Sequence, residues 1–246
     1  MDSVIRIVLA AFIVILCGFI AGIAYNGFIE SSYRASLESS FTYNLSLSTD
    51  STLVNATFFI PVPEDRGGNS PIIEDFSAGN VSGLPENWTA ILYDTGKTTL
   101  VKITARSIPG PVTGGSQAPV VITLAVNSTD RHRIETADPI GNGTMFRPVD
   151  DLRRVPCLAG TTDIGMPECF EYHIPVYADY EAGENASVTI TTSLTGRNDW
   201  KIFGPEFNRY TAGFTVTFIG RSNGWGTAAG VLVDRNGYYD APAMNP

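Results

Sequence analysis

The sequence predicts an all-β fold, an antiparallel β-sandwich, preceded by one N-terminal transmembrane α-helix. A run of eighteen residues from Ile7 to Ala24 carries no charge and no strongly hydrogen-bonding side chain. From Phe41 onward, apolar and polar residues alternate with a period of two, which places successive strand side chains on opposite faces of a sheet. No other apolar run has the helical repeat of about 3.6 residues and the length of a core helix, and strands do not alternate with helices. Packed antiparallel sheets are therefore the expected architecture.

The apolar run is long enough to cross a bilayer. At about 1.5 Å per residue its helix would be roughly 27 Å long, close to the thickness of a hydrocarbon core. Tyr25 and Phe28 follow it, at positions typical of interfacial aromatic side chains. Residues 1–29 are therefore predicted to be a retained membrane anchor, in contact with the lipid bilayer through residues 7–24.

A cleaved secretory signal is the alternative for this segment. Gly22 and Ala24 are small residues at the spacing that a signal peptidase prefers. The apolar part of such a signal is usually shorter, about 7–15 residues, and follows several positive charges, whereas Arg6 is the only basic side chain before the run. A lipoprotein signal at Cys17 is less consistent, because the residue before it is Leu16, where a small residue is expected.

Residues 30–40 are expected to continue the helix as a short stalk, since Glu30 and Arg34 form an i,i+4 pair of opposite charges. The β-sandwich then occupies residues 41–246, as a single domain or with a subdivision near the Pro- and Gly-rich segment 107–118. Near the chain end, Asn236-Gly237 between apolar and aromatic residues indicates a tight type I′ hairpin. The predicted strands are 41–48, 53–62, 88–93, 98–106, 119–127, 172–178, 186–195, 211–220 and 228–234.

Seven sequons for N-glycosylation follow the apolar run, and none precedes it. Unselected sequence of this composition would contain roughly two or three such triplets. Sequons on one side only indicate that the N-terminus is cytoplasmic and that the rest of the chain is extracellular. The predicted glycosylation sites are Asn44, Asn55, Asn80, Asn87, Asn127, Asn142 and Asn185.

Four of these asparagines lie on the polar side of a predicted strand. In FTYNLSLS the apolar positions are odd-numbered, so Asn44 faces away from the core. Asn55 is likewise out of step with an apolar set predicted to begin at Val54, and Asn127 and Asn185 are out of step with their own neighbours. Their placement favours attached glycans, although polar strand residues without glycans would have the same parity.

Cys157 and Cys169 are the only cysteines after the apolar run, and they lie twelve positions apart in a segment rich in turn-forming residues. We predict that they form a disulfide bond, which suits an oxidising exterior. Closing a loop of about 13 residues stabilises a fold by on the order of 3 kcal/mol. Cys17 lies inside the apolar run, where a thiol usually serves packing.

Charge and composition exclude several functions. A net charge of -9 without basic clusters disfavours nucleic acid as a partner, because binding it requires Lys and Arg to neutralise phosphates. A Ser-His-Asp hydrolase needs a histidine base, and His132 and His173 are the only histidines, neither near a nucleophile motif. The chain has too few His and Cys side chains to form a zinc site. We therefore expect no enzyme and no cofactor, and calcium at the carboxylates of Asp179, Glu181 and Glu184 stays an open alternative.

One hydrophobic helix, an acidic β-rich domain and abundant sequons together resemble archaeal single-pass cell-surface proteins, a category that includes pilins. Pilins carry a basic leader that ends in Gly just before the helix, and MDSVIRIVL contains no such site. The resemblance rests on layout and implies a structural, adhesive or partner-binding role outside the cell, with other surface proteins or further copies of the chain as partners. A surface-filament subunit and a carbohydrate-active enzyme that uses paired carboxylates are the two alternatives.

Overall fold

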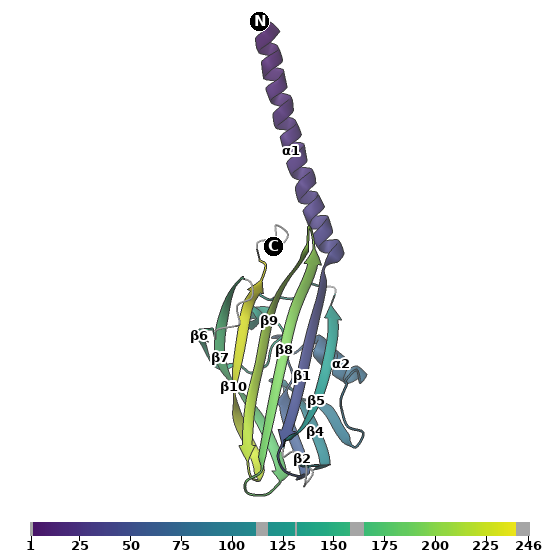
Figure 1. Cartoon of the computed structure of the whole chain (residues 1–246), viewed down its shortest axis with the longest axis vertical. Helices are drawn as coiled ribbons and strands as arrows, with labels where there is room; N and C mark the ends of the chain where they lie inside the picture. Colours follow the sequence, from purple (N-terminus) through teal and green to yellow (C-terminus); the bar gives the residue numbers. More distant parts are fainter. Residues whose placement is uncertain (1, 112–117, 131, 158–164, 240–246) are drawn as a thin grey trace.

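A computed structural model describes residues 2–111, 118–130, 132–157 and 165–239 (Figure 1). The chain begins with one long helix, α1 (Asp2–Ser36), and a single residue, Leu37, separates it from the first strand. Antiparallel strands make up most of the remainder, as predicted. The elements after α1 are β1 (Glu38–Thr49), β2 (Leu53–Pro61), α2 (Pro71–Ala78), β3 (Trp88–Asp94), β4 (Thr99–Ile108), β5 (Val120–Asp130), α3 (Pro139–Asn142), β6 (Asp150–Val155), β7 (Gly165–Glu181), β8 (Ser187–Lys201), β9 (Pro205–Ile219) and β10 (Ser222–Gly237).

The strands form one curled antiparallel sheet in the order β3-β4-β2-β7-β10-β9-β8-β1-β5. Strand β7 is paired twice along one edge, with β2 at Phe58 and Phe59 and with β6 nearer the start of β7. Since all the described strands belong to this one sheet, the structure does not confirm the predicted division into two packed sheets. The segment 107–118 joins β4 to β5, which lie towards opposite edges of the sheet, and its residues 112–117 lie outside the described residues.

A short helix covers the gap between the two edges of the sheet. Helix α2 contacts β3 at one edge and β5 at the other. After α2, Ser82 pairs with Ala125 of β5 through two backbone hydrogen bonds of 3.0 and 3.1 Å, which protects the outer edge of that strand. The hydroxyl of Ser70 caps α2 by accepting the Ile72 N–H at 3.1 Å. The two edges of the sheet are therefore joined through this segment.

The core lies on the inward side of the curl. Alternation in β1 is as predicted, with Phe41, Tyr43, Leu45 and Leu47 all buried. Large tyrosines cross the interior where a neighbouring strand carries glycine: a Cβ atom on Gly230 would lie 2.4 Å from the ring of Tyr172. Glycine at this position therefore makes room for a ring that spans two strands.

Two local predictions are wrong. Asn55 has a φ of +53°, and the pairing of β2 with β7 shifts register there, so Val54 turns outward and is 40% exposed. The Asn236-Gly237 pair forms no hairpin. Strand β10 continues to Gly237 between β7 and β9 with a register shift before Asn236, and the Tyr238 N–H then donates to the Phe207 carbonyl at 2.8 Å. Pairing on both sides of β10 holds this segment extended.

Candidate functional site

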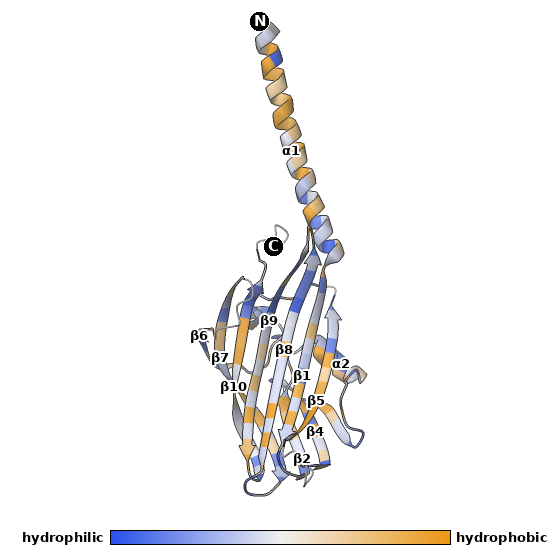
Figure 2. Ribbon diagram, viewed as in Figure 1, coloured by the Kyte–Doolittle hydropathy of each residue, from blue (hydrophilic) through white to orange (hydrophobic). Residues whose placement is uncertain are grey.

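Helix α1 projects from one end of the sheet (Figure 1). In the described part of the chain it is the one helix long and apolar enough to cross a membrane, and none of its most apolar stretch is buried within the protein. Figure 2 shows apolar residues along its projecting part. The apolar side chains of this stretch therefore do not pack in the core of this chain.

The last two turns of α1 pack against the sheet. Ile29 and Tyr33 are buried, and the ring of Tyr33 meets Trp200 at the end of β8 edge-on, with ring centroids 5.5 Å apart. Leu37 and Ile202 pack against these two rings, and we call Tyr33, Leu37, Trp200 and Ile202 the junction cluster.

Polar contacts reinforce the junction. The Ser36 hydroxyl accepts the Lys201 N–H at 2.9 Å and lies 2.7 Å from the Ser32 carbonyl, to which it donates. The Trp200 Nε1–H donates to the Glu206 carboxylate at 2.8 Å, across the β8–β9 connection. Residues 30–40, predicted as a stalk, thus consist of the end of α1, Leu37 and the start of β1, and they are held to β8 rather than free.

The sequon asparagines lie at the surface of the domain. Six of them are exposed, and Asn44 is half-buried on the outward side of β1. Asn127 on β5 lies opposite Thr42 of β1, so Asn44 and Asn127 are diagonal neighbours on the same outward face. None of the seven lies within strands β7, β8, β9 or β10. None of the seven predicted glycosylation sites is therefore buried in the core.

Cys157 and Cys169 form the predicted disulfide bond, with Cα atoms 5.2 Å apart. The bond connects the segment after β6 to β7, next to the pairing of Val155 with Cys169. Residues 158–164 of the closed loop lie outside the described residues. Cys17 lies exposed on α1.

The calcium candidates do not come together as a binding site. Asp179 lies on β7 and accepts a hydrogen bond of 3.2 Å from the Asn223 amide of β10. Glu181 ends β7, Glu184 lies in the turn before β8, and both are exposed. Among the described residues, no group of three or more His, Cys, Asp or Glu side chains is placed to hold a metal ion.

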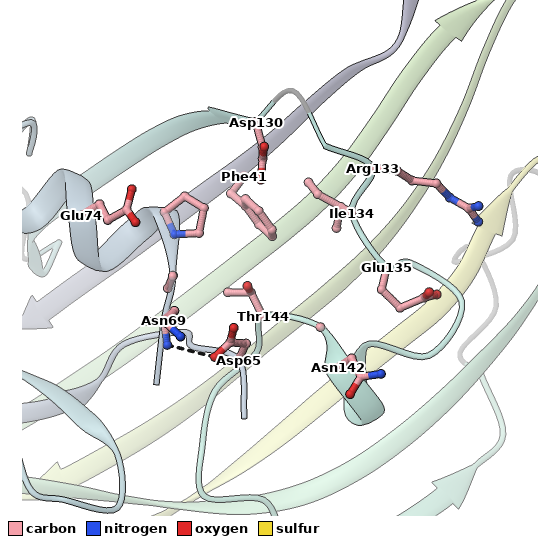
Figure 3. A pocket seen from close by; sticks show the side chains of 13 residues that line it. Phe41, Asp65, Asn69, Glu74, Asp130, Arg133, Ile134, Glu135, Asn142 and Thr144 are labelled. Carbon is pink, nitrogen blue, oxygen red and sulfur yellow. Dashed lines mark hydrogen bonds between the residues drawn. The ribbon is translucent and has the colours of Figure 1, made fainter. Parts of the chain in front are cut away.

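A cleft of about 230 Å³ collects several acidic side chains near the start of β1 (Figure 3). They come from four segments: the loop after β2, helix α2, the end of β5 and the loop before α3. Phe41 and Ile134 form its apolar part, and Arg133 lies at one side. The charged and amide side chains that line it are Asp65, Asn69, Glu74, Asp130, Arg133, Glu135 and Asn142.

Three of the four acids are already bonded to their own loops. Asp65 accepts the N–H groups of Gly67 and Asn69 at 2.7 and 2.9 Å. Asp130 accepts the His132 N–H at 2.8 Å, and Glu135 accepts the Ala137 N–H at 2.9 Å. These carboxylates therefore order the loops around the cleft, as acidic side chains commonly do in turns.

A buried amide fixes the wall of the cleft. Asn198 of β8 accepts the Ile134 N–H at 2.8 Å and donates to the Ile134 carbonyl at 2.9 Å. It also bonds Ser39 and Asn208, so that its donors and acceptors are all used inside the protein. No sequence pattern pointed to this cleft, because its acids are separated by up to 70 positions and meet only through the curl of the sheet.

Each of the two histidines lies near a carboxylate. The His132 ring lies 2.9 Å from Asp130 and is exposed, and His173 lies 3.8 Å from Asp151 on the outward side of β7. Neither ion pair includes a serine, threonine or cysteine nucleophile. No family model, curated protein or solved structure matches this chain.

Proposed function

We propose that this chain is a membrane-anchored, N-glycosylated extracellular protein without catalytic activity, whose β-domain has a structural, adhesive or partner-binding role. One observation carries the proposal. The apolar part of α1, which is long enough to cross a membrane, stands clear of the domain, while the last turns of α1 pack into the junction cluster and connect the helix to the β-sheet. Such a body displays its domain at one membrane surface.

The orientation follows from the modifiable residues. All seven sequons belong to the domain and lie at its surface, and glycans are added outside the cytoplasm. The disulfide between Cys157 and Cys169 suits the same oxidising side. We therefore propose a single-pass protein of the cell membrane with a cytoplasmic N-terminus, similar in layout to archaeal surface proteins.

The acidic cleft is the natural place for the alternative, a carbohydrate-active enzyme with paired carboxylates. Two features weigh against that use. The carboxylates of Asp65, Asp130 and Glu135 accept hydrogen bonds from backbone N–H groups of their own loops. Among the described residues, Glu74 is then the one cleft acid whose carboxylate is not engaged in this way. Asn142, which lines the cleft, is also the asparagine of a sequon. A glycan attached to it would obstruct access to the cleft.

A filament subunit is the second candidate. The apolar residues are distributed evenly around α1, which is compatible with this arrangement, since such a helix is covered equally well by lipid or by the helices of neighbouring copies. Electron microscopy of the surface of expressing cells separates the two arrangements: filaments that bind an antibody against the β-domain support the subunit, and a smooth membrane supports the lone anchor.

Alkaline extraction of membranes tests the anchor. The full chain is expected to remain in the membrane pellet, and protease added outside intact cells is expected to digest the β-domain. Replacing Val14 and Ile15 by aspartate should release the protein, because each charge near the bilayer centre costs about 3 kcal/mol. The matched control places the same charges on exposed apolar residues of the domain, Val121→Asp with Ile219→Asp. Release of the unmodified chain would overturn the proposal.

A further inference from the structure

The connection between β8 and β9 places an aromatic ring beside the C-terminal third of α1. Phe203 lies at the tip of this connection, with its ring centroid 6.3 Å from that of Tyr25 and 6.1 Å from that of Phe28. The rings of Phe203 and Tyr25 are stacked, at an interplanar angle of 19°. We call Tyr25, Phe28 and Phe203 the tip cluster. It joins two segments that lie far apart in the sequence.

The tip cluster keeps most of its surface uncovered. Phe203 is 70% exposed, Tyr25 55% and Phe28 53%, although the ring of Phe203 contacts both of the others. The preceding residue, Ile202, instead packs into the junction cluster with Tyr33 and Trp200. One side of the Phe203 ring therefore packs against the two aromatic rings of α1. The rest of the cluster forms an apolar surface that the described residues leave exposed.

The depth of this surface follows from the helix rise. Phe28 lies four residues beyond Ala24, the last residue of the apolar run, which is about 6 Å along the helix axis. The headgroup layer on each side of a bilayer is about 5–7 Å thick, and aromatic rings concentrate there. If residues 7–24 fill the hydrocarbon core, the ring of Phe203 lies in the headgroup layer.

The hairpin is held in this position by its own contacts. The backbone of Lys201 is bonded to the Ser36 hydroxyl, and Trp200 is packed on Tyr33, so the tip cannot move away from α1 without breaking the junction. Lys201 itself is exposed next to the tip, where an ammonium group can approach lipid phosphates. An aromatic residue flanked by a cation is a common composition at membrane interfaces.

We infer that the β8–β9 tip is a second membrane contact: Phe203 inserts into the headgroup layer of the bilayer that α1 crosses. The inference rests on the proposed membrane anchor. Because the tip lies on one side of α1, this contact fixes which face of the β-domain turns towards the membrane and prevents the domain from swinging about the helix. In this contact the Phe203 ring lies at the boundary between headgroups and acyl chains, and the Lys201 ammonium group lies near the lipid phosphates.

Spin labelling tests the contact in the full chain reconstituted into vesicles of phosphatidylcholine and phosphatidylglycerol. In a Cys17→Ala background, with the disulfide intact, a nitroxide is attached at Phe203→Cys or at Gly204→Cys. The second position keeps Phe203 in place and has open space for a side chain, with no atom within 4 Å of its Cβ. Labels at Ile15→Cys and Ile219→Cys, both exposed within this chain, serve as membrane and aqueous references.

We expect labels at both tip positions to collide with oxygen more often, and with a water-soluble nickel chelate several-fold less often, than the label at Ile219→Cys. Chelate accessibility equal to that of Ile219→Cys, in protein that still floats with the vesicles, would overturn the inference and leave the anchor intact. Protein that fails to float would overturn both. A label shielded from oxygen and chelate alike would show that another protein surface, such as a second copy, covers the tip.

Discussion

Replacing Asp234 by asparagine is expected to stabilise the protein at neutral pH and to have little effect near pH 4. Asp234 lies on the inward side of β10, opposite Glu168 of β7, and is 3% exposed. Burial, and after it the negative charge of Glu168, raise the pKa of Asp234 from 3.8 to about 6. Between these two values the folded protein holds more protons than the unfolded chain, so stability falls as the pH rises through this window.

The magnitude follows from the same pKa values. The difference between a pKa of 3.8 and one of about 6 corresponds to a loss of stability on the order of 3 kcal/mol once Asp234 is ionised in the folded protein. For a domain of this size, about 1 kcal/mol shifts the melting temperature by roughly 2–4 °C. The Asp234→Asn variant should therefore melt about 6–12 °C above the parent protein at pH 7.5, with a difference near zero at pH 4.

Thermal melts of the full chain in detergent, followed by tryptophan fluorescence from pH 4 to pH 7.5, measure this difference directly. Glu181→Gln, an exposed carboxylate at the end of β7, is the control and should leave the pH dependence unchanged. A difference between Asp234→Asn and the parent that does not change with pH would refute the reasoning, because it would mean that Asp234 titrates alike in the folded and unfolded chains.

Three further predictions concern the core packing, the junction and the disulfide bond. Gly230→Ala should cost roughly 1–3 kcal/mol in chemical denaturation, because its Cβ would lie 2.4 Å from the Tyr172 ring, whereas Gly224→Ala on the same strand meets no atom within 4 Å and should be nearly neutral. Trp200→Ala should raise amide hydrogen exchange in residues 29–37, since it removes the ring against which Tyr33 packs; unchanged exchange there would contradict a rigid junction. Cys157→Ser with Cys169→Ser should lower stability by about 3 kcal/mol, and reduction should then have no further effect on the melting temperature.

Local patterns predicted most of the strands. Period-two alternation located β1 and its buried residues, because one face of that strand meets the core and the other faces outward. The same rule failed at Val54, where the bulge at Asn55 adds one residue and reverses the parity. Alternation assumes an unbroken register, and a bulge can be recognised only from the partner strand.

Three elements were not predicted, and the shortest of them, helix α3, has only four residues. Helix α2 has only eight residues, too few for a helical repeat to stand out, although Ser70-Pro71 at its start and Gly79 after its end are capping signals that indicate such a helix. Strand β6 has a charged sequence, DDLRRV, and pairs only with β7. Neither propensity nor alternation marks it as a strand.

Contacts between distant parts of the chain could not be predicted at all. The disulfide followed from two cysteines close together in the sequence, but Ser36 and Lys201 of the junction lie 165 positions apart. Nothing in the sequence around Trp200 indicates that its ring packs on Tyr33 at the end of α1. Topology alone brings them together, because β8 pairs with β1 and β1 follows directly from the helix.

The central claim is that α1 is retained as an anchor for a glycosylated domain outside the cytoplasm. An intact-mass measurement on protein purified from alkali-washed membranes tests it most directly. We predict a chain that still contains residues 7–24, carries glycan mass at several sequons and lacks the two hydrogens lost on forming the Cys157–Cys169 bond. A chain that begins at Tyr25, or one that carries no glycan, would contradict this account.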